Sequence, residues 1–338
     1  MTKLALRLDM RAPAFAGVPR DFYRIGLDMA QWADANGFAE CMLSEHHGTD
    51  DGYLPSPLVY GAAIAARTEK LRIMVSAIVL PLHDPIRIAE DAAVLDQLSN
   101  GRLDLVMVAG FRPPEFALFD RPLAGRGKVL EESISVLRKA WTGEPFEYRG
   151  STVRVTPTPQ QASGPKILLG GATPAAARRA ARIGDGFVPA VPDIYDNYRR
   201  ECIELGKKPA DDKVIGCLAT FISNDPDTLW EKIAPHALHE TNEYSRWYAE
   251  GGTSGPFQPI EDAEQLRAMG VYRVFTPEQC LEFADTLGPD GWLFFHPLLS
   301  GLDPETAWQS LHLLKEEADL LLRPVPVISG EAPNSKIP

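Results

Sequence analysis

A glutamate and two histidines stand side by side at Glu45, His46 and His47. An imidazole accepts or donates a proton near neutral pH, so one of these histidines is a candidate acid–base catalyst. Because neighbouring side chains of an extended segment point to opposite faces, at most one histidine can enter a shared site. A purely structural hydrogen-bonding role is one alternative. A metal site with Asp50 and Asp51 is another, but no HxH or HExxH spacing supplies a second ligand, and we expect no metal.

A glycine-rich turn runs from Gly170 to Pro174, between an apolar strand-like segment and a segment with helical spacing. A glycine backbone lets a ligand approach closely, and the free N–H groups at a helix N-terminus attract anions. The turn therefore indicates a phosphate site. The alternative is a tight strand-to-helix turn in which Thr173 only caps the helix.

Strand-like and helix-like segments alternate along nearly the whole chain and position both groups. Eight strands, each followed by a helix, predict a (β/α)8 TIM barrel, whose active site lies at the carboxyl ends of the strands. An open doubly wound sheet is the alternative, although no GxGxxG follows the first strand. The expected strands are Lys3–Met10, Phe38–Leu43, Leu71–Leu80, Arg102–Ala109, Lys166–Leu169, Gly186–Pro189, Val214–Ile222 and Gly291–His296.

Two interruptions and one tail depart from this alternation. Residues 146–155 have two short arms around a turn and predict an inserted β-hairpin. Residues 240–260 include a glycine-rich stretch and predict a long loop between the seventh and eighth strands that covers the barrel mouth. Residues 1–322 are expected to form a single barrel domain, and the proline-containing residues 323–338 an extended tail.

Composition excludes several classes of protein. The 338 residues carry 34 Lys+Arg against 46 Asp+Glu, a net charge of −12. An acidic chain repels nucleic-acid phosphates, so we expect no nucleic-acid partner. No apolar run of 18 residues is present, and the charged start does not resemble a signal peptide, so we expect no membrane association. Four scattered cysteines form neither a zinc nor a disulfide pattern, and a cytoplasmic location is the simplest expectation.

Several segments, in the same order along the chain, resemble the bacterial luciferase-like monooxygenases. The resemblance covers residues 3–220 well and the final strand and helix loosely. The segments that carry it are Leu43–His47, Ser76–Pro85, Ala89–Arg102, Glu115–Phe119 and Ile167–Gly186.

The resemblance implies a flavin-using (β/α)8 barrel that oxidises an organic substrate with O2 and takes reduced FMN from a separate reductase. It gives His46 the position of the family's catalytic histidine and Ser76-Ala77 the position of a non-prolyl cis peptide under the flavin ring. It also places the phosphate at Gly170–Thr173 and Arg126. The cofactor-binding residues expected in this way are Ser76, Ala77, Ala109, Gly110, Arg126, Gly170, Gly171, Ala172 and Thr173.

The chain also departs from the luciferases within the resemblance. Ala109 stands where luciferases carry a phosphate-binding arginine, and Val108 where they carry a reactive cysteine. A sister branch uses the deazaflavin F420, so F420-dependent hydride transfer is the alternative activity. A non-catalytic flavin-binding subunit of the same fold is the alternative from another class. Relatives commonly dimerise through helices two and three, which suggests a homodimer.

The expected mouth of the barrel is mostly apolar. This composition suits a small-to-medium hydrophobic substrate. The residues expected at the mouth are Phe111, Trp247, Phe257 and Trp292.

Overall fold

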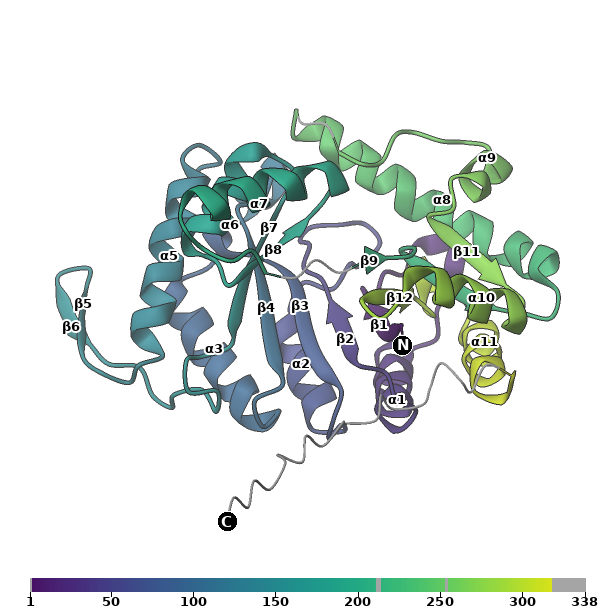
Figure 1. The fold of residues 1–338 in the computed structure, drawn as a ribbon, viewed down its shortest axis with the longest axis horizontal. Helices are drawn as coiled ribbons and strands as arrows, with labels where there is room; N and C mark the ends of the chain where they lie inside the picture. The colour runs from purple at the N-terminus through teal and green to yellow at the C-terminus, as the bar shows by residue number, and fades with distance from the viewer. Residues whose placement is uncertain (1, 211–213, 253–254, 318–338) are drawn as a thin grey trace, which may run out of the picture.

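The computed structural model describes residues 2–210, 214–252 and 255–317, and ten of their strands form one parallel sheet (Figure 1). The hydrogen-bonded order is β11-β10-β12-β1-β2-β3-β4-β7-β8, with β9 also paired to β12. No pairing links β8 to β11 among the described residues. The strands are β1 Lys3–Leu8, β2 Glu40–Leu43, β3 Arg72–Val79, β4 Leu103–Val108, β7 Lys166–Gly171, β8 Gly186–Pro189, β9 Val214–Ile215, β10 Ala219–Ile222, β11 Tyr272–Phe275 and β12 Gly291–Phe295.

Helices follow the strands and pack outside the sheet, so the predicted (β/α)8 barrel is confirmed (Figure 1). Several begin with a proline in the first turn and a side-chain cap just before it, an arrangement that favours a helix start. The helices are α1 Phe22–Ala35, α2 Pro57–Ala65, α3 Pro85–Leu98, α4 Pro113–Leu118, α5 Arg126–Ala140, α6 Pro174–Ile183, α7 Tyr195–Glu204, α8 Pro226–Glu250, α9 Ala263–Ala268, α10 Pro277–Leu287 and α11 Pro304–Glu317.

The prediction for residues 240–260 is wrong over its first half. Helix α8 continues to Glu250, and irregular structure begins only at Gly251. The helix buries Glu240, Thr241, Ser245 and Trp247, a face with too many polar residues to show an apolar helical period.

The last third of the chain also contains elements that the sequence did not reveal. Helix α9, strand β11 and helix α10 lie between the irregular segment and β12. The predicted strand Val214–Ile222 is divided, because residues 216–218 separate β9 from β10. These elements are short, and a four-residue strand such as β11 carries too few alternations to be distinguished from a loop.

The predicted hairpin at residues 146–155 is confirmed. Strands β5 Phe146–Tyr148 and β6 Ser151–Val153 pair antiparallel and project away from the barrel (Figure 1). Arg149 and Gly150 both have positive φ, as a two-residue hairpin turn requires. The expected tail at 323–338 lies outside the described residues, and the single domain at 1–322 stays a prediction.

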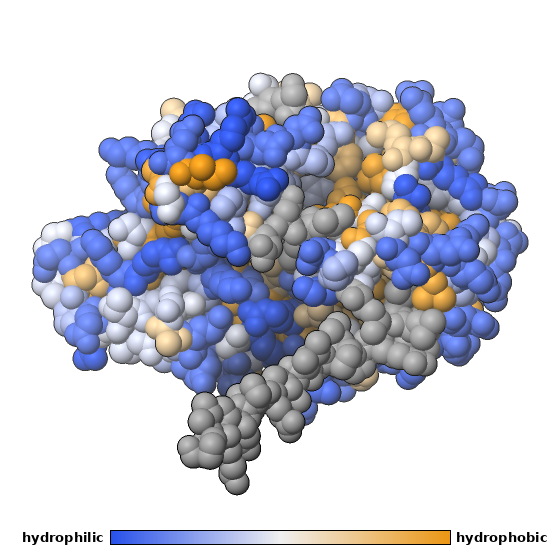
Figure 2. Space-filling view, viewed as in Figure 1, coloured by the Kyte–Doolittle hydropathy of each residue, from blue (hydrophilic) through white to orange (hydrophobic). Residues whose placement is uncertain are grey.

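The described surface is mainly hydrophilic. Figure 2 shows hydrophobic residues gathered chiefly in the hollow beside α8. Among the described residues, no helix combines the length and apolar character needed to cross a membrane.

Arg102 fixes the end of the barrel opposite the expected active site. Its buried guanidinium donates to the carbonyl oxygens of Ala65, Thr68 and Leu71 near the end of α2, and its Nε donates to Ser99 O. One side chain therefore pairs carbonyls that the end of a helix leaves without partners.

We predict that Arg102→Ala lowers the free energy of unfolding by about 3 kcal/mol or more, because several buried carbonyl oxygens lose charged donors. Arg102→Lys is the matched control and should lose less, since it keeps one cationic donor. Urea unfolding measures both variants. An Arg102→Ala protein within about 0.5 kcal/mol of the wild type would contradict this role.

Candidate active site

One cavity of about 570 Å³ opens at the carboxyl ends of the barrel strands. The carboxyl-terminal parts of β3, β4, β7 and β8 line it, together with the segments that follow β2, β4, β7 and β8 and the starts of α5 and α6. The cavity brings together all ten residues that the sequence nominated: His46, Ser76, Ala77, Ala109, Gly110, Arg126, Gly170, Gly171, Ala172 and Thr173.

His46 follows β2 and reaches the cavity with a fixed orientation. Its Nδ1 lies 2.7 Å from Oε1 of Glu115, and its ring packs 4.6 Å from the ring of Trp247. In the neutral imidazole, Nδ1–H donates to the carboxylate, which leaves Nε2 as the acceptor. The carboxylate therefore selects both the ring orientation and the tautomer.

Glu115 is a buried carboxylate held in its charged form. Burial raises its pKa, but the bonds from His46 and from the backbone N–H of His47, with the charge of Arg112, outweigh burial and lower the pKa overall. Arg112 Nη1 lies 3.1 Å from Glu115 Oε1, and its guanidinium lies 4.2 Å from the ring centre of Trp247. Glu115 thus joins the β2 loop, α4 and α8.

His47 points away from the cavity, as alternation along the extended segment predicts. Its Nε2 lies 3.2 Å from Glu45 Oε1, and its ring packs 4.7 Å from the ring of Phe119. Only one histidine of the pair therefore lines the cavity.

The glycine-rich turn caps helix α6 and also lines the cavity. Thr173 Oγ1 accepts a hydrogen bond from Ala176 N, which caps α6, and the turn also lines the cavity. A Cβ on Gly171 would lie 2.5 Å from Cβ of Ala176. The glycine therefore lets α6 pack against β7, and a substitution there would disturb the helix as well as a ligand.

Two arginines stand beside this turn. Arg126, at the start of α5, donates to Gly110 O at 2.8 Å, and Arg179 of α6 donates to Glu131 at 2.9 Å. Both line the cavity, where the N-termini of α5 and α6 also face. Helix N-termini and guanidinium groups attract anions, so this end of the cavity suits a phosphate.

The remaining wall suits a flat apolar group. The peptide bond between Ser76 and Ala77 is cis, as the family resemblance implies. Gly110 has φ of +76°, and a Cβ there would meet Val79 Cγ1 at 2.5 Å. The apolar lining residues are Val79, Val106, Val108, Leu169 and Val188.

Helix α8 covers the cavity with two tyrosines, Tyr244 and Tyr248. Tyr248 stacks on Phe111 at 4.6 Å, and Tyr244 stacks on Phe257 at 5.4 Å. Phe111 thus lines the cavity as predicted. Phe257 does not line it but packs on Tyr244, which does.

Three of the four residues expected at the mouth do not line the cavity: Trp247, Phe257 and Trp292. Trp247 is fully buried behind His46, and Trp292 packs with Ala5 and Phe294 at the opposite end of the barrel, near the start of β12. The prediction is wrong for Trp292 because a residue at the beginning of a parallel strand lies at the amino end.

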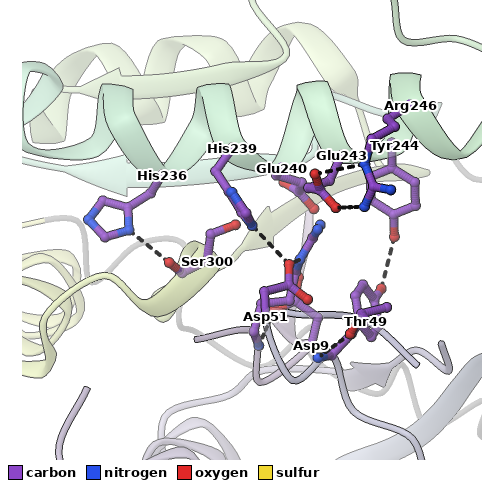
Figure 3. Close-up of polar contacts among 12 residues, drawn as sticks. Asp9, Thr49, Asp51, His236, His239, Glu240, Glu243, Tyr244, Arg246 and Ser300 are labelled. Atoms are coloured by element: carbon purple, nitrogen blue, oxygen red, sulfur yellow. Dashed lines mark hydrogen bonds and ion pairs between the residues drawn. The ribbon is translucent and has the colours of Figure 1, made fainter. Parts of the chain in front are cut away.

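Polar contacts on the lower side of α8 attach it to the barrel (Figure 3). His239 Nε2 lies 2.8 Å from Asp51 Oδ2, which also accepts from Arg11 Nε at 2.6 Å. Tyr244 and Tyr53 share a hydrogen bond of 2.9 Å. These contacts fix the helix that covers the cavity.

Sequence reasoning missed the roles of Arg179, Arg112 and the α8 tyrosines. Arg179 lies five residues into α6, where periodicity alone does not show which neighbour it meets. Arg112 stands two residues after Gly110, but its contacts with Glu115 and Trp247 are not visible in the sequence, and the α8 tyrosines reach the site from a distant segment. A wider search for arginines within two turns of the predicted phosphate turn would have found Arg179.

Comparison with known proteins agrees with this geometry. The family model described as luciferase-like monooxygenase matches residues 11–286. A 4-hydroxyprotoasukamycin monooxygenase of Streptomyces nodosus subsp. asukaensis is 30% identical over 47% of this chain and 44% of its own. The oxygenase component of a flavin-dependent trigonelline monooxygenase from Acinetobacter baylyi is 27% identical over 51% and 49%. The chain thus spans about half the length of the curated relatives it matches.

Solved structures share the fold over nearly the whole chain. The monooxygenase RslO1 of Streptomyces bottropensis has a TM-score of 0.77 at 23% identity, covering 94% of this chain and 98% of its own. The oxygenating constituent of 3,6-diketocamphane monooxygenase from Pseudomonas putida, in complex with FMN, has a TM-score of 0.70 at 20% identity, covering 94% and 100%. An F420-dependent secondary alcohol dehydrogenase has 0.64 at 15%, covering 95% and 99%.

The contact between Asp51 and α8 predicts a pH dependence of stability. Burial raises the pKa of Asp51, but His239 and Arg11 together lower it from 3.8 to about 2. Because the pKa of Asp51 is lower in the folded than in the unfolded protein, its charged form stabilises the fold at pH values above the unfolded-state pKa. This contribution, about 2 kcal/mol, is lost as the pH falls through the folded-state pKa.

We therefore expect Asp51→Asn to be less stable than the wild type at pH 6, with the difference shrinking between pH 4 and pH 2. Urea unfolding of the two proteins across this range measures it. A difference that stays constant with pH would show that Asp51 does not act through its charge.

Proposed function

The chain belongs to the luciferase-like monooxygenase family, and we propose that it is a flavin-dependent monooxygenase that uses reduced FMN and O2 to oxidise a small-to-medium hydrophobic organic substrate. The observation that carries the proposal is one cavity with an anion-binding end and a carboxylate-oriented histidine. Reduced FMN, when bound, supplies the electrons that let O2 react with the substrate.

The residues of the cavity fit FMN in shape and charge. The backbone of Gly171–Thr173 and the start of α6 would hold the phosphate, with Arg126 and Arg179 beside it. Arg179 provides a cation at this end although Ala109 occupies the position of the luciferase arginine. The apolar wall beside Ser76-Ala77 would receive the ring system.

His46 is the proposed acid–base residue. Its Nε2 is free to accept or donate a proton because Nδ1 is held by Glu115. Glu115 acts through the histidine and is a positioning residue. Tyr244 and Tyr248 on α8 would keep water from the reacting atoms, which protects reactive oxygen species from unproductive decay.

A separate reductase is the proposed source of reduced FMN. No dinucleotide-binding fingerprint follows the first strand, and the Acinetobacter baylyi relative is named as an oxygenase component. A homodimer through α2 and α3 is proposed from Val59, Val94 and Leu98, which expose apolar side chains on these helices.

F420 is the second candidate cofactor, supported by the loss of the arginine at Ala109 and by the F420-dependent structural neighbour. It would make the protein a hydride-transfer oxidoreductase. The two arginines beside the glycine-rich turn favour FMN, since both line the cavity where they would pair with its terminal phosphate.

Ala175 tests the phosphate end without disturbing the fold. It lies in the first turn of α6, is exposed and lines the cavity. An aspartate there suits the helix dipole but repels a phosphate. We predict that Ala175→Asp weakens reduced FMN binding by about tenfold or more, whereas the uncharged Ala175→Asn changes it little.

Anaerobic fluorescence titration measures both affinities, and thermal unfolding checks that neither variant is destabilised. Equal FMN affinity in the aspartate and asparagine variants would place the phosphate elsewhere.

His46→Ala should lower turnover by about 100-fold or more while FMN binding is largely kept, because an acid–base group is lost. Glu115→Gln should also lower turnover and shift its pH profile, since the carboxylate no longer sets the tautomer. His236→Gln, on α8 and away from the cavity, is the matched control.

Oxygen uptake with reduced FMN and a panel of hydrophobic substrates measures turnover per folded molecule. Wild-type turnover in His46→Ala would rule out the catalytic role. FMN binding without turnover by the wild type on any substrate would favour the non-catalytic subunit.

A further inference from the structure

Three side chains of metal-ligating types meet beside the cavity, and of these only Glu45 also lines it. Glu45 and His47 follow β2, and His83 follows β3, so the carboxyl ends of two adjacent strands bring them together. His83 Nε2 lies 2.7 Å from Glu45 Oε1, and His47 Nε2 lies 3.2 Å from the same oxygen. The three ligand atoms all lie within 4.8 Å of one another.

His47 Nε2 supports a ligand at this place. The side chain is more than nine-tenths buried, and Nε2 makes no hydrogen bond within the described residues. The nearest oxygen, Glu45 Oε1, lies 3.2 Å away and is already engaged by His83 Nε2 at 2.7 Å. A buried polar atom without a partner costs free energy unless another group satisfies it.

The spacing resembles that of a metal site. Zinc bonds of about 2.0–2.1 Å in a tetrahedron place ligand atoms about 3.3 Å apart. The two separations from Glu45 Oε1, 3.2 Å to His47 Nε2 and 2.7 Å to His83 Nε2, are both shorter than that value. Small rotations of the histidine rings, which pack against Phe119, would bring the ligands to bonding positions.

We propose that Glu45 Oε1, His47 Nε2 and His83 Nε2 bind a divalent metal ion of the zinc class, with a fourth position open to solvent beside His83. Two imidazoles and one carboxylate form a ligand set that such ions bind strongly. The sequence indicated no second ligand because His83 is 36 residues from His47 and reaches it only through the β2–β3 pairing.

The metal ion would stabilise the β2 and β3 loops from behind His46. Glu45 Oε2 already accepts from Val79 N at 2.6 Å, so the ion would join the two strand ends through a second connection. His47 and His83 do not line the cavity, whereas Glu45 does, so the ion would lie next to the cavity wall.

The test uses untagged full-length protein freed of metal with a chelator and then titrated with Co²⁺. We expect one equivalent to bind, with the visible absorption of a four- or five-coordinate cobalt site. His83→Ala should weaken binding by at least about 100-fold, because loss of even an outer-shell partner costs about 10–100-fold. The exposed His312→Ala is the matched control and should bind like the wild type.

A second measurement is the shift of Tm with Zn²⁺. The wild type and His312→Ala should gain several degrees, and His83→Ala should gain none. Wild-type protein that binds no Co²⁺, or that binds it as weakly as His83→Ala, would overturn the proposal. So would a Zn²⁺ shift of equal size in His83→Ala, whose folding is checked by circular dichroism.

Discussion

The contact between His46 Nδ1 and Glu115 Oε1 is the interaction on which the rest of the site depends. A buried carboxylate requires compensation, and this one receives it from His46, from the His47 backbone and from Arg112. Arg112 in turn packs on Trp247 and pairs with Glu250 at 3.7 Å, so α8 is joined to the same centre. One carboxylate thus orients the histidine and connects the three segments that enclose it.

The barrel explains why His46 and the glycine-rich turn line one cavity although they are far apart in the sequence. His46 follows the second strand and the glycine-rich turn follows the fifth, so both lie at the carboxyl ends of the strands and line the same cavity. A cofactor with an apolar ring and a terminal phosphate could span them. Helix α8 then closes the cavity from above, held by the contacts of Asp51 and Tyr53.

The sequence predicts the local features of this arrangement better than the distant ones. The barrel, the hairpin and the cavity residues follow from alternation and from the family resemblance, because both appear in contiguous segments. Helix α8 was missed beyond residue 240 because its buried face includes Glu240 and Ser245, which an apolar period does not include. The meeting of His83 with His47 depends on strand register, which no local pattern encodes.

The most direct test of the account is an anaerobic titration of the protein with FMN and F420, each oxidised and reduced, followed by absorbance and fluorescence. The account predicts one reduced FMN bound per chain, more tightly than oxidised FMN and more tightly than either form of F420. Tighter binding of F420 would contradict the proposed chemistry. Binding of neither cofactor would contradict the assignment of the cavity.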